Sequence, residues 1–108
     1  MEPNWVLVHR VQNALASDEV LPKYLIAYTS EKLAEYGRLL CKQKNAYIVQ
    51  FMPPVFLQKI VTHEPQVEGI ALVTHMGPLV PHKGSRAREI TKAYIKRTAF
   101  LSMKFENE

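Results

Sequence analysis

The sequence predicts an α/β fold: about three mostly parallel, buried strands that alternate with helices, followed by a long basic C-terminal helix. Three observations lead to this prediction. Short apolar runs occur at 24–28, 46–52 and 70–75, apolar side chains recur at helical spacing between the first two runs, and the same spacing returns over 86–104. The 108 residues suit one globular domain, 1–108, with a single core.

The first segment, residues 4–17, fits either of two elements. Pro3 and Asn4 form a helix start signal, and apolar side chains follow at helical spacing. The segment also begins with Trp-Val-Leu-Val, a run of strand-forming residues. The sequence therefore leaves both a helix and a strand open.

The next two elements follow from an apolar run and a capping residue. The run at 24–28 is short and almost continuously apolar, which predicts a buried strand. Thr29 or Ser30 then caps a helix that continues to about Lys44, with its apolar positions on one face and its charged positions on the other.

The middle of the chain contains the main ambiguity of the fold. The run at 46–52 predicts a second buried strand, which ends at Pro53 and Pro54. Pro54 suits the first position of a two-turn helix over 55–61, but the residues of that segment favour a strand. If it is a strand, it pairs with 70–75 as an antiparallel hairpin, and the alternative fold is α+β with that hairpin at 55–75.

The C-terminal third is predicted as strand, loop and helix. Residues 70–75 form the third strand, and 76–84, with two prolines and two glycines, form a loop. Ser85 is the expected N-cap of a final helix from about Arg86 to Lys104.

Charge is concentrated in that last segment. Residues 1–82 hold seven Lys and Arg residues and seven Asp and Glu residues, whereas 83–104 hold seven Lys and Arg residues against Glu89 alone. One segment thus carries the whole basic excess of the chain. Basic clusters of this kind are typical of proteins that bind nucleic acid through its phosphates.

The predicted function is non-enzymatic nucleic-acid binding, to DNA or RNA, through backbone contacts. Cations at a helix N-terminus face the partial positive charge of its free N–H groups, and a bound phosphate relieves that repulsion. Gly84 lets the phosphate approach the backbone, and Ser85 positions the donors. The predicted binding residues are Lys83, Gly84, Ser85, Arg86, Arg88, Lys92, Lys96 and Arg97.

Two other functions use overlapping residues. A regulator or adaptor would set the same basic helix against an acidic protein partner. An enzyme acting on a small phosphorylated substrate would use His75 as an acid or base at the carboxyl ends of parallel strands, near Thr29 and Ser30. The sequence also allows a homodimer, because Ile95, Phe100 and Met103 lie beyond the main apolar stripe of the predicted helix.

Several classes are not expected. The sequence has no Walker-type loop, no dinucleotide-binding glycine motif and no nucleophile elbow, so no catalytic residues and no cofactor are assigned. His63, His75 and His82 lack the paired spacing of zinc ligands. Cys41 is the single cysteine, which favours a cytoplasmic setting, and no apolar run approaches the ~20 residues of a membrane span.

Overall fold

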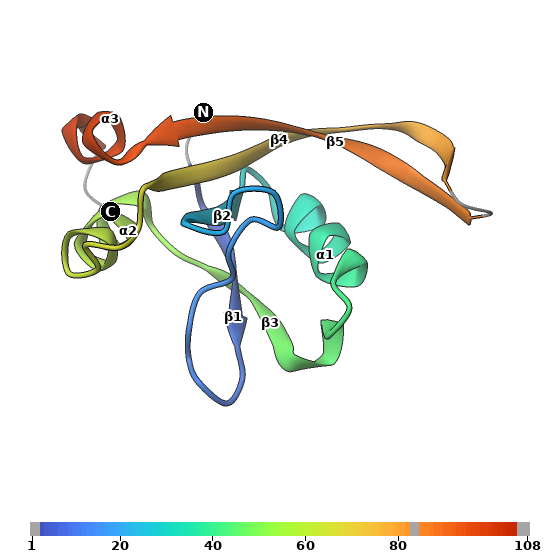
Figure 1. Ribbon diagram of the computed structural model, residues 1–108, viewed down its shortest axis with the longest axis horizontal. Helices are drawn as coiled ribbons and strands as arrows, with labels where there is room; N and C mark the ends of the chain where they lie inside the picture. Colours follow the sequence, from blue (N-terminus) through green and yellow to red (C-terminus); the bar gives the residue numbers. More distant parts are fainter. Residues whose placement is uncertain (1–2, 83–84, 106–108) are drawn as a thin grey trace.

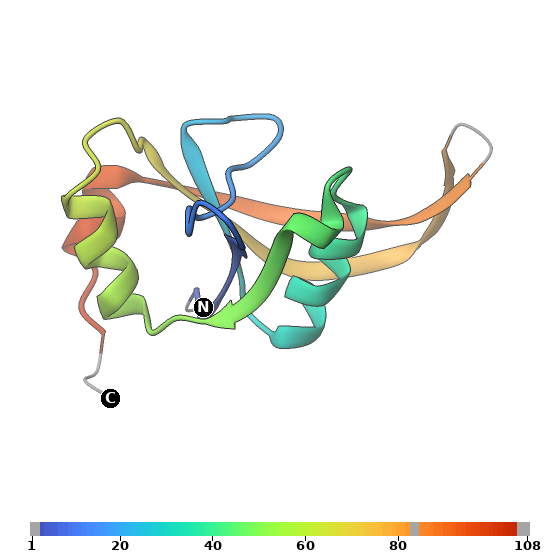
Figure 2. The same ribbon diagram turned by 90° about the horizontal axis from the view of Figure 1, so that it is seen from below.

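The structure is a computed structural model that describes residues 3–82 and 85–105, with 78–82 and 85–89 described by their backbone alone. The elements, in chain order, are β1 (Trp5–His9), β2 (Tyr24–Tyr28), α1 (Glu31–Leu40), the 3-10 turn η1 (Lys44–Ala46), β3 (Tyr47–Phe51), α2 (Pro54–Thr62), β4 (Gly69–His82), β5 (Ser85–Lys96) and α3 (Arg97–Ser102). Among the described residues, five strands form one mixed sheet in the order β3-β1-β2-β4-β5 (Figures 1 and 2).

The predicted α/β class is wrong, because the sheet is mostly antiparallel. β2 and β4 pair in parallel, while β1 with β2, β1 with β3 and β4 with β5 are antiparallel. Two parallel strands need a long crossover connection between them. The stretch from α1 to α2, which lies between β2 and β4 in the sequence, is that connection. The fold is therefore α+β, with one parallel pair inside an otherwise antiparallel sheet.

The alternative hairpin over 55–75 is wrong as well, although its α+β class is right. Residues 54–62 form α2, which begins at Pro54 and buries Leu57 and Val61 four residues apart. Proline at the first helical position and this spacing outweighed the strand preference of the individual residues. The long hairpin of the fold is formed by β4 and β5.

The predicted long basic helix is wrong. Residues 85–96 are β5, and α3 is only six residues long. Ile90, Thr91, Tyr94 and Ile95 are strand-forming residues, and pairing along β4 satisfies their backbone groups. The three described helices have six to ten residues, and none is long and apolar enough to cross a membrane.

The predicted loop over 76–84 is wrong for residues 76–82, which continue β4. The two prolines are tolerated because this part of β4 has β5 as its only described neighbour. Pro78 falls in the irregularity between Met76 and Leu79, and Pro81 lies opposite Arg86.

The N-terminal half matches the sequence more closely. The strand at 24–28 is confirmed as β2, and the helix after it is confirmed as α1, with the Ser30 hydroxyl accepting the Leu33 N–H at 3.2 Å. The helix ends at Leu40 rather than near Lys44, which belongs to η1. Residues 5–9 are the strand β1, so the helix alternative for 4–17 is wrong. The strand predicted at 46–52 is β3, but it is an edge strand rather than a buried one, with Ile48 38% and Phe51 49% exposed.

Two hydrophobic clusters lie on opposite faces of the sheet. Side chains alternate between faces along each strand, so Val6 and Val8 join one cluster and Leu7 joins the other. The helices α2 and α3 cover the first face, where Phe100 is fully buried, and α1 covers the second, around Tyr28. The expectation that Phe100 stands outside the packed stripe is therefore wrong.

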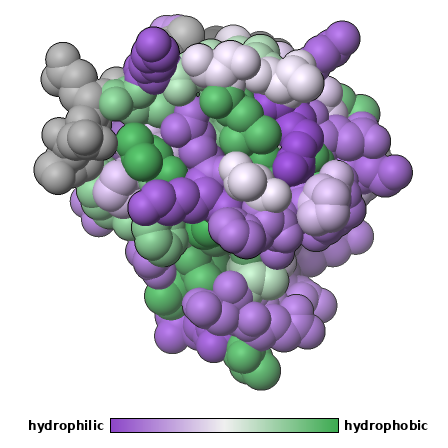
Figure 3. All heavy atoms as spheres, turned by 90° about the vertical axis from the view of Figure 1, so that its left-hand side faces the viewer, coloured by the Kyte–Doolittle hydropathy of each residue, from purple (hydrophilic) through white to green (hydrophobic). Residues whose placement is uncertain are grey.

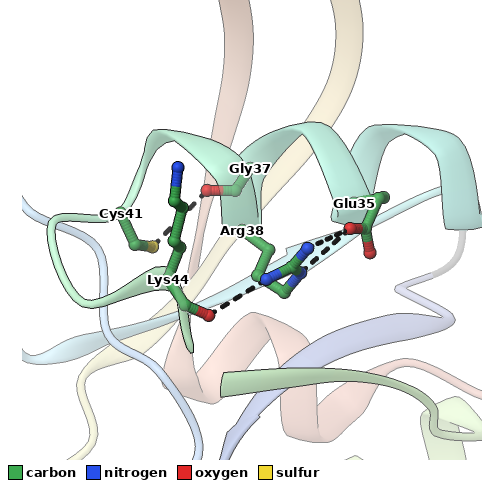
Figure 4. Close-up of polar contacts among 5 residues, drawn as sticks. All are labelled: Glu35, Gly37, Arg38, Cys41 and Lys44. Atoms are coloured by element: carbon green, nitrogen blue, oxygen red, sulfur yellow. Dashed lines mark hydrogen bonds and ion pairs between the residues drawn. The ribbon is translucent and has the colours of Figure 1, made fainter. Parts of the chain in front are cut away.

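The end of α1 is tied to η1, which positions the start of β3 (Figure 4). The Arg38 guanidinium pairs with Glu35 one turn earlier and donates to the Lys44 carbonyl at 3.1 Å. The Cys41 thiol donates to the Gly37 carbonyl at 3.4 Å. These contacts fix the short connection between a helix on one face of the sheet and the strand at its edge.

Candidate nucleic-acid interface

The described part of the basic segment begins on β5 of the β4–β5 hairpin and continues into α3. β2 pairs with β4 over Gly69–Val73, and beyond Val73 the described part of β4 pairs with β5 alone, over 75–82 and 85–91. This distal half is a two-stranded ribbon that reaches beyond the body of the protein, coloured ochre to orange in Figures 1 and 2. A ribbon of this width fits the major groove of duplex DNA as an α-helix does.

Three of the first five predicted binding residues lie on β5, the second strand of this hairpin. Lys83 and Gly84 lie outside the described residues. The backbone of Ser85, Arg86 and Arg88 belongs to β5, where Arg88 is paired with Leu79. The prediction that Ser85 caps a helix is therefore wrong, and the backbone N–H groups here belong to a strand ladder rather than to a helix N-terminus.

Lys92 is held by a buried carboxylate that the sequence did not reveal. Its ammonium lies 2.5 Å from Oδ1 of Asp18, whose side chain is fully buried. The Tyr94 hydroxyl donates to Oδ2 of Asp18 at 2.9 Å, and the Leu21 backbone N–H donates to the same oxygen at 3.0 Å. These contacts join β5 to the turn before β2.

The charge of Asp18 is stabilised in the folded protein. Burial alone would raise the pKa of this carboxyl, but the hydrogen bonds from Lys92, the Leu21 N–H and Tyr94 outweigh burial and hold its pKa below the ordinary value. The hydrogen bond to Asp18, with burial and the charge of Asp18 adding to it, raises the pKa of Tyr94. Asp18 is therefore an ionised carboxylate at neutral pH.

Arg97 and Lys96 differ sharply in their surroundings. The Arg97 guanidinium donates to the Glu64 carbonyl at 2.8 Å and the Val67 carbonyl at 3.0 Å, so it fastens the turn that follows α2. Lys96 is exposed, and its ammonium has no hydrogen bond or ion pair within the described ranges. Of the three predicted cations whose side chains are described, Lys96 alone is thus available to a phosphate.

The missed residue, Asp18, has little signal in the sequence. It lies in Ser-Asp-Glu, a polar stretch typical of an exposed turn. Its partners gave a clue, because Lys92 and Tyr94 are two residues apart and therefore share one face of a strand. The helical interpretation of 86–104 placed them on different faces.

A cavity of about 280 Å³ opens beside this cluster, between α1 and the sheet. Its lining includes Asp18, Lys92, Tyr28 and Cys41. Burial raises the pKa of Tyr28, with the charges of Cys41, Asp18 and Glu19 adding to it, and burial also raises the pKa of Cys41. Both groups are therefore protonated at neutral pH, so neither is an activated nucleophile.

His75, the residue of the enzyme alternative, is exposed on β4. Its Nδ1 lies 2.8 Å from the hydroxyl of its neighbour Thr74, and no carboxylate contacts it among the described side chains. The carboxyl end of β2 meets the middle of β4, since the Thr29 N–H donates to the Val73 carbonyl at 3.2 Å. However, the Ser30 hydroxyl at that edge is already used as the cap of α1.

Within the described ranges, no three His, Cys, Asp or Glu side chains gather as metal ligands. The chain matches no protein-family model, no curated protein and no solved structure. Geometry and charge alone therefore carry the functional proposal.

Proposed function

We propose that this protein binds nucleic acid without catalysis, contacting phosphates through the β4–β5 hairpin. One observation carries the proposal: the first part of the segment that holds the basic excess of the sequence, residues 85–91 with Arg86 and Arg88, forms one strand of a projecting two-stranded ribbon. A ribbon that extends from a compact body can enter a groove that the body itself cannot. Cations on it release counterions from the nucleic acid when they meet phosphates.

The roles of the predicted residues divide according to their contacts. Arg86 and Arg88 belong to the strand of the distal ribbon, and Lys96 is an exposed cation at the other end of β5, opposite Gly69. Lys83, which precedes this strand in the sequence, is proposed to add to the charge. Lys92 and Arg97 are positioning residues in this proposal, because Asp18 and the carbonyls after α2 already occupy their donors.

The test is fluorescence anisotropy of labelled single-stranded and duplex DNA and RNA, titrated from about 50 to 300 mM salt. The variant Arg86→Glu/Arg88→Glu is expected to bind more weakly and to flatten the salt slope by about 0.9 for each duplex phosphate that the protein no longer neutralises. The matched control is Lys32→Glu/Lys59→Glu, which makes the same charge change at two exposed positions on α1 and α2.

The outcomes separate the hairpin from a general charge effect. Binding that weakens with salt, and that only the hairpin variant impairs, supports the proposal. An equal loss in both variants would assign binding to net charge rather than to the hairpin. No binding at the lowest salt removes nucleic acid as the ligand, and an acidic protein surface becomes the partner to test.

A further inference from the structure

The two edges of the described sheet differ in their chemistry. The edge at β5 carries Lys92 and Lys96, and lysine on an edge strand discourages pairing with another strand. The edge at β3 has the sequence Tyr-Ile-Val-Gln-Phe, without a charge. Ile48 is 38% and Phe51 49% exposed there, so β3 lacks the usual protection of an edge strand.

The hydrogen bonds of β3 show which backbone groups face outward. The Arg10 N–H donates to the Ala46 carbonyl, and the Met52 N–H donates to the Asn4 carbonyl. In an antiparallel ladder the groups of alternate residues point the same way, so the even-numbered residues of β3 face β1. The N–H and C=O groups of Val49 and Phe51 and the C=O of Tyr47 therefore point to the open edge, while the Tyr47 N–H bonds to Lys44.

The outward backbone groups of Tyr47, Val49 and Phe51 can pair with the same groups of a second copy of β3. In an antiparallel pair of β3 strands centred there, Val49 faces Val49 of the second copy and Phe51 faces its Tyr47. The outward groups then form about four hydrogen bonds between the strands. Aromatic residues directly opposite one another are favourable cross-strand pairs. Phe51 already packs edge-on against Trp5, with ring centroids 5.2 Å apart, so its ring is held at the edge.

The charges that flank β3 also favour an antiparallel pair of β3 strands over a parallel one. Lys42 and Lys44 precede β3, and Pro53 and Pro54 follow it. An antiparallel pair sets the lysine end of one strand against the proline end of the other, so no like charges meet. A parallel pair would place Lys44 beside its own copy, which is unfavourable in a chain of net charge +4.

The surface beside the edge extends the area that a second copy can cover. A groove of about 610 Å³ runs between α2 and the sheet, and Gln50 of β3 and Phe56 of α2 both line it. Phe56 is 53% exposed. Figure 3, which faces the end of the molecule with α2 and α3, shows hydrophobic residues reaching the surface between hydrophilic ones.

We propose that the open edge of β3 is a dimerisation surface, on which β3 of a second copy pairs antiparallel about a two-fold axis at Val49. The two sheets join into one, and the two β4–β5 hairpins lie at its far ends because β5 is the opposite edge. The surface differs from the helix face expected from Ile95 and Phe100, since both of these residues pack in the core. The proposal does not depend on nucleic-acid binding.

The first test is sedimentation velocity of the full chain over a concentration series, compared with Ile48→Lys/Gln50→Lys. Both side chains are exposed in the single copy, and in the pair each new lysine faces a lysine of the other copy. We expect the natural chain to dimerise and this variant to sediment as a monomer. The control Val20→Lys/Thr98→Lys adds the same charge at exposed positions before β2 and on α3 and is expected to remain a dimer.

A second test reads the register directly and adds no charge at the edge. In a Cys41→Ser background, Val49→Cys places two thiols opposite each other across the two-fold axis, within the Cα separation of about 4.4–6.8 Å that a disulfide allows. Mild oxidation is expected to link Val49→Cys into a covalent dimer and to leave Phe51→Cys unlinked. A monomer at every concentration, a dimer that survives Ile48→Lys/Gln50→Lys, or linkage at 51 but not at 49 would each overturn the proposal.

Discussion

Replacing Asp18 with asparagine is the most direct test of the charge cluster that anchors β5. The side chain keeps its size, and its remaining oxygen can still accept the Leu21 N–H. The amide NH₂ group, however, faces a donor at Lys92, so the charge-assisted hydrogen bond is lost. The change therefore removes one specific interaction without opening a cavity.

The size of the effect follows from the exposure of the two partners. A hydrogen bond to a charged group contributes about 1.5–3 kcal/mol net. Lys92 is partly exposed, at 23%, so in Asp18→Asn its ammonium can turn to water and little further cost remains. We expect the free energy of unfolding to fall by about 2 kcal/mol, which corresponds to a decrease in Tm of about 10 °C for a domain of this size.

The reverse change, Lys92→Met, is expected to cost more. It leaves a fully buried carboxylate with its two remaining donors and no counter-charge, and an uncompensated buried charge costs about 3–5 kcal/mol. In the double variant the loss in free energy of unfolding is expected to be smaller than the sum of the two single losses. Asp18→Asn removes the carboxylate charge that Lys92→Met alone leaves unpaired.

Urea denaturation of the four proteins at neutral pH measures these free energies. A loss below about 0.5 kcal/mol in Asp18→Asn would show that the pair adds nothing to stability, as in an ordinary surface ion pair. A cost of Lys92→Met smaller than that of Asp18→Asn, or additive losses, would refute the description of Asp18 as a buried, paired charge.

Measuring the stability of the natural chain and of Asp18→Asn as a function of pH tests whether folding lowers the pKa of Asp18. The pKa of Asp18 in the folded protein lies below its value in the unfolded chain, so its stabilisation is present above the unfolded value of about 3.9 and is lost as the pH falls through the folded pKa. The difference in stability between the natural chain and Asp18→Asn should be constant above about pH 5 and shrink below about pH 4.

The remaining predictions concern the contacts that hold the helices, and each is read from the same denaturation curves. Arg97→Ala should lower the free energy of unfolding by about 1–3 kcal/mol, since it removes the side-chain donor to the Val67 carbonyl and leaves the Glu64 carbonyl with the Val67 N–H alone; Arg97→Lys should restore only part of it. Ser30→Ala should cost about 1 kcal/mol by removing the cap of α1, and Ser30→Thr should cost less. Gly37→Ala should cost about 1–3 kcal/mol, because its Cβ would overlap the hydroxyl oxygen of buried Tyr28; an unchanged stability would contradict this packing.

The elements that sequence reasoning predicted correctly are those whose local and tertiary preferences agree. β2 is apolar and lies in the middle of the sheet, and α1 has both an amphipathic pattern and the hydroxyl of Ser30 as its cap. In α2, Pro54 and the spacing of the buried residues supplied the helix signal, but strand-forming residues left the prediction open. Such segments need no distant partner to decide their structure.

The C-terminal segment failed because its structure depends on a distant partner. Residues 85–96 contain Ala87, Lys92, Ala93 and Lys96, which favour a helix, and also Ile90, Tyr94 and Ile95, which favour a strand. The neighbouring strand β4 decided the outcome, since a backbone paired along its length satisfies every second N–H and C=O group. The distal part of β4 was itself not predicted as a strand, because residues 76–82 contain two prolines and proline is normally confined to the ends and edges of sheets.

The basic excess of the C-terminal segment is the same whether 85–96 is a helix or a strand, because it is a property of the sequence. Which of the cations are free to bind a ligand depends on the fold. The fold divides the predicted cations into those with internal partners, Lys92 and Arg97, and an exposed cation, Lys96. It also gives Lys92 a function that a solvated helix face would not have, since its pairing with Asp18 holds the base of the hairpin against the body. Breaking that pair should therefore weaken phosphate binding only as far as it loosens the hairpin, whereas charge reversal at Arg86 and Arg88 should remove the phosphate contacts themselves. Comparing Asp18→Asn with the hairpin variant in one salt titration separates the two effects: the first should lower affinity at an unchanged salt slope, and the second should lower the slope.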